Sequence, residues 1–350
     1  MNLYEALEAG DLDRLKTLDL DVRAKGGPRN WEPLLYVCFS PNANPKSPHA
    51  ARMVETARML LQRGADPNAS YIDEHWPDWP LPCLYGATGV NNNPALALVL
   101  LEAGANPNDQ ESLYHSTEHP DLDCVRLLLK HGAVPKGTNS LNHMLDREDL
   151  DGLELLLNAG ADPNARNVEG ETSLHWAVWR GRSAASIERL LDAGAAIDVE
   201  SKDGRTAYAV AVLTDQTGIA QLLAQRGAKA NVPPVKPTEA GLIPKLASNH
   251  FTSAVRTLLD AGFPVDARGS TGETALHWAC WKGYPDLAKL LLERGAPLTV
   301  KDTEYDATPA GWLEHGSRNC GSRDGRGGGD YAGVERLLRA QETDGRSGRA

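Results

Sequence analysis

Apolar residues along this chain gather in short runs, and each run is followed by the same kind of break. Two or three apolar residues precede two variable positions and then a glycine, which alanine usually follows, as in LLLNAGADPNA at 155–165 and LLLERGAPL at 290–298. The glycine recurs at Gly64, Gly104, Gly132, Gly160, Gly194, Gly227, Gly262 and Gly295. The intervals are 40, 28, 28, 34, 33, 35 and 33 residues, so the chain is built from repeats.

Each part of this repeat has a physical reason. The apolar run supplies the buried stripe of a helix, and the glycine stands where the ending helix needs a left-handed residue. A second pattern precedes the apolar run and is clearest as GETSLHWAVWRG at 170–181 and GETALHWACWKG at 272–283. Thr172 and Thr274 stand where the N-cap of a further helix is expected. The pattern therefore predicts two helices in each repeat.

Together these patterns resemble the ankyrin-repeat family, whose signature is T-P-L-H-x-A followed by LLLxxGA. The resemblance covers roughly residues 3–340. It implies an all-α solenoid in which pairs of antiparallel helices stack around a concave groove. Residues 3–18 resemble an N-terminal capping helix pair, and residues 305–316 with 331–340 resemble the C-terminal cap.

The domain organisation follows from how such repeats hold together. Stacked repeats contact only their neighbours and form one folding unit, so residues 1–340 are expected to be a single ankyrin-repeat domain and residues 341–350 a disordered tail. The segments 41–51 and 70–80 lengthen the N-terminal repeats, and 317–329 is expected to be a flexible insert in the last repeat.

Composition narrows the class of function. The net charge of −11 gives no clustered Lys and Arg for nucleic acid. The five cysteines are scattered without a CxxC pair, so neither a disulfide framework nor a zinc knuckle is expected. The chain shows no signal peptide at its start and no apolar stretch long enough to span a membrane. We expect a cytoplasmic monomer that binds another protein and contacts neither nucleic acid nor membrane.

The family resemblance implies that the first helix of each repeat presents three positions to the groove, and their i, i+3 and i+4 spacing places them on one helical face. The expected protein-binding residues are His119, Asp146, Arg147, Trp179, Arg180, Trp281 and Lys282. Trp and Arg are prominent among them, and these residue types most often anchor protein interfaces. Trp176 and Trp278 share the same helices, and for them packing between neighbouring helices is the favoured interpretation. The family resemblance implies that His175 and His277 form structural hydrogen bonds between repeats.

One local motif suggests a different chemistry. Residues 115–119 read HSTEH, which has the HxxEH spacing of a class of zinc proteases that the rest of the chain does not resemble. His143 lies one short repeat later. The alternative hypothesis is therefore a metal-dependent hydrolase in which His115, His119 and His143 bind a divalent metal such as zinc and Glu118 is the catalytic base. The leading interpretation is a binding module without catalysis or cofactor, in which these residues form a polar surface.

Overall fold

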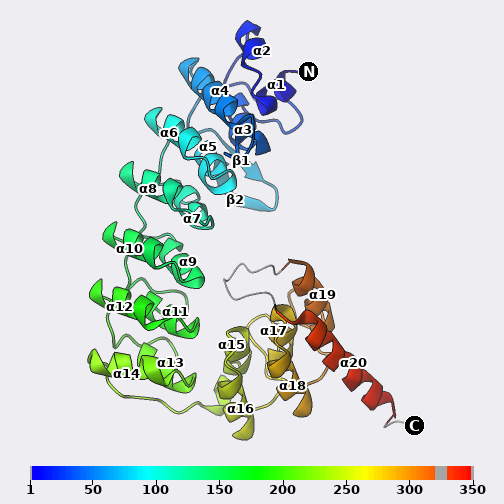
Figure 1. The fold of residues 1–350 in the computed structure, drawn as a ribbon. Coiled ribbons are helices and arrows are strands. Elements are labelled where there is room, and N and C mark those ends of the chain that lie inside the picture. Colours follow the sequence, from blue (N-terminus) through cyan, green and yellow to red (C-terminus); the bar gives the residue numbers. More distant parts are fainter. Residues whose placement is uncertain (1, 320–328, 348–350) are drawn as a thin grey trace. The chain divides into compact units, whose positions relative to one another are not determined.

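The computed structural model describes residues 2–319 and 329–347, and these separate into two compact units. The first unit comprises Met1–Met144 and Asp149–Asp162, and the second comprises Leu145–Glu148 and Pro163–Ala350. Figure 1 shows short helices in pairs along the chain. The single domain expected over residues 1–340 stays a prediction, and each unit is described by itself below.

The first unit is built from paired helices and one β-hairpin. Its elements are α1 (Leu3–Ala9), α2 (Leu12–Thr17), α3 (Pro33–Cys38), η1 (Pro41–Ala43), α4 (Ala50–Gln62), β1 (Ser70–Asp73), β2 (Trp76–Pro82), α5 (Cys83–Tyr85), η2 (Gly86–Val90), α6 (Pro94–Glu102), α7 (Ser112–Ser116), α8 (Asp123–Lys130), α9 (Ser140–Arg147) and α10 (Leu150–Asn158). The helix α9 lies at the boundary, because its last three residues belong to the second unit. Second helices pack on second helices, as α2 on α4, α4 on α6 and α6 on α8.

The second unit repeats the same arrangement. Its elements are α11 (Ser173–Trp179), α12 (Ala184–Asp192), α13 (Ala207–Leu213), α14 (Thr217–Gln225), η3 (Pro237–Glu239), α15 (Leu242–Ser248), α16 (Thr252–Asp260), α17 (Ala275–Lys282), α18 (Pro285–Glu293), α19 (Pro309–Asn319) and α20 (Tyr331–Ser347). First helices stack on first helices, as α11 on α13 and α15 on α17, while second helices stack in a separate row. The predicted all-α class of stacked helix pairs is confirmed.

The predicted helix ends are also confirmed. All eight repeat glycines have positive φ angles between 82° and 98°, which is the left-handed region that glycine adopts without strain. At the N-terminus of α11, the Thr172 backbone N–H donates to Nδ1 of His175 at 3.2 Å. The other ring nitrogen, Nε2, therefore carries the proton and donates to the carbonyl oxygen of Arg205 in the next repeat, at 3.0 Å. His277 makes the equivalent bond to Ala307 at 3.1 Å.

The hairpin was not predicted. Strands β1 and β2 pair antiparallel from Ser70↔Pro82 to Asp73↔Trp76, with an irregularity between Ile72 and Asp73. Three prolines in β2 obscured the strand pattern, because proline cannot donate to a ladder and is confined to strand edges. A two-stranded sheet consists of edges alone, so the prolines are accommodated. The hairpin leaves Ile72 63% exposed and Trp79 51% exposed.

The C-terminal pair, α19 and α20, forms the predicted cap. Helix α20 runs on to Ser347, whereas the sequence predicted disorder from residue 341, and residues 348–350 lie outside the described part. Ala340, Gln341 and Glu342 are good helix formers, which explains the continuation. Most of the predicted insert 317–329, including Cys320, also lies outside the described residues. No helix in the described residues is both long and apolar enough to cross a membrane.

Candidate functional site

Two adjoining cavities lie in the second unit, and we call them together the Trp groove. The larger, of about 600 Å³, is lined by Asn167, Glu169, Glu171, Trp176, Ser201, Asp203, Arg205, Thr238, Glu239, Gly241, Leu242, Lys245, Ser248, Gly269, Ser270, Glu273 and Trp278. The smaller, of about 370 Å³, is lined by Glu171, Trp176, Trp179, Arg180, Lys245, Ser248, Asn249, Trp278, Trp281 and Lys282. Glu171, Trp176, Lys245, Ser248 and Trp278 line both, so the two cavities share a wall.

Two copies of one sequence pattern supply the walls of the Trp groove. Trp176 and Trp179 stand at i and i+3 on α11, and Trp278 and Trp281 stand at the same places on α17. Residues three apart share a helical face, which is why both pairs point to one side. A glutamate precedes each N-cap threonine, Glu171 before α11 and Glu273 before α17, and each is only 7% exposed.

Glu171 is held by three donors. Its Oε1 accepts a hydrogen bond from Nε1 of Trp179 at 2.8 Å and forms an ion pair with Nζ of Lys245. Its Oε2 accepts a hydrogen bond from the side-chain amide of Asn167 at 3.1 Å. The same ammonium lies 4.3 Å from the centroid of the Trp179 ring, a cation–π distance. Lys245 thus satisfies a buried carboxylate and covers an indole face at once.

Trp179 was expected to face the groove and bind a partner, but only 3% of its surface is exposed. Its indole is anchored to Glu171 and covered by Lys245, so it supports the wall of the smaller cavity rather than projecting from it. Trp176 is the partly exposed member of the pair on α11. Trp281 is also partly exposed, and its ring stacks on His315 with centroids 5.0 Å apart.

Asp146 and Arg180, two expected binding residues, contact each other at Trp176. The Oδ1 atom of Asp146 accepts from Nε1 of Trp176 and from Nε of Arg180, both at 2.9 Å. The Arg180 guanidinium lies 4.4 Å from the centroid of the Trp176 ring. Arg147 and Lys282 are half-buried. A carboxylate and an indole face together therefore hold a cation here, as they do at Lys245.

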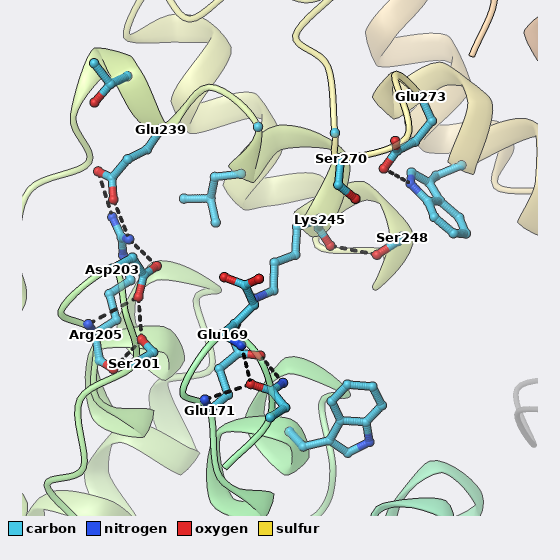
Figure 2. Close-up of a pocket in the computed structure, with 17 residues that line it drawn as sticks. Glu169, Glu171, Ser201, Asp203, Arg205, Glu239, Lys245, Ser248, Ser270 and Glu273 are labelled. Atoms are coloured by element: carbon cyan, nitrogen blue, oxygen red, sulfur yellow. Dashed lines mark hydrogen bonds and ion pairs between the residues drawn. The ribbon is translucent and has the colours of Figure 1, made fainter. Parts of the chain in front are cut away.

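A buried arginine lies at the other end of the larger cavity. Figure 2 shows Arg205 between Asp203 and Glu239, with Glu273 on the opposite side. The Arg205 guanidinium is bidentate to Glu239, at 2.9 and 3.3 Å, the strongest geometry for such a pair. Hydrogen bonding from Arg205 holds the pKa of Glu239 below its usual value.

Glu273 has no such cationic partner among the described residues. Its Oε2 accepts from the backbone N–H and hydroxyl of Thr271 at 3.0 and 2.8 Å. Its Oε1 has only a long contact of 3.4 Å with Nε1 of Trp278. Sequence reasoning overlooked Glu273, Glu171, Lys245 and Arg205, although the repeated Gly-Glu-Thr triplet was a signal for the two glutamates.

The residues of the hypothetical metal site lie in the first unit. Nδ1 of His115 contacts Glu118 at 3.3 Å and its Nε2 contacts Glu111 at 3.1 Å. His119 instead bonds to the carbonyl of Gly89 at 2.7 Å, and His143 to the hydroxyl of Thr117 at 2.8 Å. The three imidazoles therefore have separate partners. Within the described residues, no group of three or more His, Cys, Asp or Glu side chains is arranged to hold a metal ion.

The contact between His115 and Glu118 shifts the pKa of both groups. Burial lowers the pKa of His115, but the contacts with Glu118 and Glu111 outweigh it and raise the pKa above its usual value. The hydrogen bond from His115 holds the pKa of Glu118 below its usual value. A carboxylate that is paired in this way stays ionised and is a poor proton acceptor near neutral pH. The arrangement therefore does not favour Glu118 as a general base.

A run of aromatic rings along the first unit was also missed. Neighbouring centroids lie 4.2 Å apart for Trp31 and Tyr71, 5.0 Å for Phe39 and Tyr71 and 5.8 Å for Phe39 and Tyr85. The run continues from Tyr85 to His115 at 4.8 Å. These residues come from repeats with weak motif matches, so no shared pattern linked them in the sequence.

Comparison with known proteins identifies the scaffold. Residues 141–233 and 240–302 match a family model described as ankyrin repeats. These two segments carry ankyrin repeats. The human B-cell lymphoma 3 protein is 35% identical over 141 residues, which are 39% of this chain and 31% of that protein. The E3 ubiquitin-protein ligase KEG of Arabidopsis thaliana is 32% identical over 133 residues, 37% of this chain and 8% of the ligase.

The matched stretch is thus less than a third of either relative, so what is shared is the repeat segment. Among solved structures, the human ASB11 ankyrin repeat domain is 22% identical, with a TM-score of 0.48 over 67% of this chain and 100% of that chain. The ankyrin repeat domain of Bcl-3 is 28% identical, with a TM-score of 0.33 over 60% of this chain and 94% of that chain.

Proposed function

We propose that this chain is an ankyrin-repeat interaction module, and that a partner protein binds in the Trp groove of the second unit. The observation that carries the proposal is the pair of cavities walled by Trp176 and Trp278, both of them only half-buried. Large indole side chains in concave, largely desolvated surroundings are the usual anchors of a protein interface.

The shape of the scaffold supports the same function. Stacked repeats give an extended surface on which side chains from several first helices are presented together. Here α11, α15 and α17 all contribute side chains to the Trp groove. The relatives named above have names that describe different kinds of protein, and what they share with this chain is the ankyrin-repeat segment. We therefore carry over only one property, the binding of a partner protein by the repeats.

The test is capture of partners from cells of the source organism by the purified chain, followed by quantitative mass spectrometry. Changing Trp176→Ala together with Trp278→Ala should lower recovery of a specific partner by about tenfold or more, because loss of an interface anchor costs at least about 2 kcal/mol. These two residues are a better choice than Trp179, whose truncation would leave a buried cavity and cost about 3–5 kcal/mol of stability.

Trp79 offers a matched control. It is 51% exposed on the hairpin of the first unit, so Trp79→Ala removes an indole outside the Trp groove. Partner recovery should stay within about twofold of wild type for this variant, and every variant should remain folded at the temperature of the capture experiment. Equal loss in Trp79→Ala, or full recovery in the double variant, would contradict binding at the Trp groove.

A further inference from the structure

The charges around the larger cavity of the Trp groove are unbalanced. Five carboxylates line it, namely Glu169, Glu171, Asp203, Glu239 and Glu273, against two cationic side chains, Arg205 and Lys245. Arg205 forms ion pairs with Asp203 and Glu239, and Lys245 forms an ion pair with Glu171. A concave, low-dielectric wall with excess negative charge attracts a cation.

The Trp groove already holds two cations in one geometry. Lys245 lies over the ring of Trp179 and pairs with Glu171, and Arg180 lies over Trp176 and pairs with Asp146. In each case an indole face and a carboxylate act on the same charged group. Attraction to the ring and to the carboxylate then add, and both are stronger away from bulk water.

A third indole and carboxylate lie together at the start of α17, without a cation. Trp278 is half-buried and lines both cavities, and Nε1 of its indole faces Oε1 of Glu273 at 3.4 Å. Only 7% of the surface of Glu273 is exposed to solvent. No Lys, Arg or His among the described residues pairs with it. Thr271 and Trp278 supply hydrogen bonds to this carboxylate but no charge, so an incoming cation would supply the missing charge partner.

We propose that Trp278 and Glu273 form a subsite for an arginine side chain of the partner protein. This inference rests on the proposed function and adds the chemistry of the bound segment. A guanidinium fits because it is planar, stacks on an indole and donates to both oxygens of a carboxylate. In the same groove Arg180 combines stacking on Trp176 with a contact from its Nε to one oxygen of Asp146.

The experiment starts from random twelve-residue peptides displayed on phage and selected on the full chain. Selected peptides that Trp176→Ala weakens are synthesised with each arginine as arginine or as citrulline, its neutral isostere. On the wild-type chain, one citrulline should lower affinity by about tenfold or more, as expected for a desolvated charge pair. On the Glu273→Gln variant, the same replacement should change affinity by less than about twofold, because the partner charge is already gone.

Two variants complete the design. Glu169→Gln removes the same charge from an exposed residue of the same cavity and should leave the citrulline effect at about tenfold. Trp278→Leu keeps apolar bulk, and it should reduce the citrulline effect even if Glu273→Gln fails to fold. Selected peptides that need Trp176 but lack a citrulline-sensitive arginine would overturn the arginine subsite and leave the proposed function standing. Peptides insensitive to both Trp176 and Trp278 would contradict the proposed function itself.

Discussion

His115 and Glu118 show at the scale of single residues how a neighbour sets a charge. Because the contacts of His115 with Glu118 and Glu111 outweigh the effect of burial, its pKa lies above 6.5. Changing Glu118→Gln should therefore lower the pKa of His115, which a nuclear magnetic resonance titration of the imidazole protons measures directly. Asp123→Asn, on the outer helix α8, is the matched control and should leave the pKa of His115 unchanged. An unaltered pKa in Glu118→Gln would show that the contact is absent in solution.

The pH dependence of stability that His175 and His277 cause should be opposite in direction to that caused by His115. Burial lowers the pKa of both imidazoles below 6.5. A histidine whose folded pKa is depressed binds a proton more readily in the unfolded chain, so stability is lost as pH falls below 6.5 toward the folded pKa. His115, with a raised pKa, contributes stability below 6.5 that is lost as pH rises through its folded pKa.

Urea unfolding between pH 7.5 and 5.5, about one unit on each side of the histidine pKa, separates these contributions. The second unit should become less stable over this interval, and His277→Gln should reduce that loss, although the variant is less stable throughout. Hydrogen exchange, corrected for its intrinsic pH dependence, assigns the change to each unit. A second unit that gains stability on acidification would contradict the burial of the two imidazoles.

The site residues could be predicted only where one repeat determines them. The roles of His175 and His277 followed from the family pattern, since both bonds join neighbouring repeats. The burial of Trp179 did not follow, because it depends on Lys245 from a degenerate repeat. The long separation of Glu171 from Lys245 and of Arg205 from Glu239 hid both ion pairs from a search for local motifs.

Individual elements were predictable where the break after a helix is regular. Two glycines, one within α14 and one just after its end, test whether backbone conformation explains the repeated glycine. Gly227 ends the helix with φ +98°, and Gly218 lies in the helix, and a Cβ at either meets nothing within 4 Å. Gly227→Ala should therefore cost about 1–2 kcal/mol, because only the backbone is strained. Gly218→Ala should instead stabilise by up to about 1 kcal/mol.

Thermal and urea unfolding of the two glycine variants measure the difference. Equal effects of the two changes would show that backbone conformation does not explain the repeated glycine. The hairpin of β1 and β2 marks the limit of prediction at this scale. Its prolines argue against a strand in a large sheet, and nothing in the repeat pattern indicates that a pair of edge strands replaces the usual turn.

The repeat architecture makes a prediction at the scale of the whole molecule. Leu290 on α18 is 2% exposed, and truncation of such a residue to alanine costs about 2–5 kcal/mol. Because repeats stabilise one another through neighbours, Leu290→Ala should speed hydrogen exchange most between residues 270 and 310. Leu156→Ala, at a buried position in α10 of the first unit, is the matched control and should act on the first unit. Uniform loss of protection in both variants would contradict local coupling.

The central claim is that a partner protein occupies the Trp groove, and site-specific photo-crosslinking tests it most directly. The photoreactive residue p-benzoylphenylalanine replaces either Ser270, an exposed residue that lines the larger cavity, or Lys289, an exposed residue of the outer helix α18. Illumination of the captured complex should crosslink the partner from position 270 and not from position 289. Crosslinking from position 289 alone would place the partner on the outer helices and contradict the account.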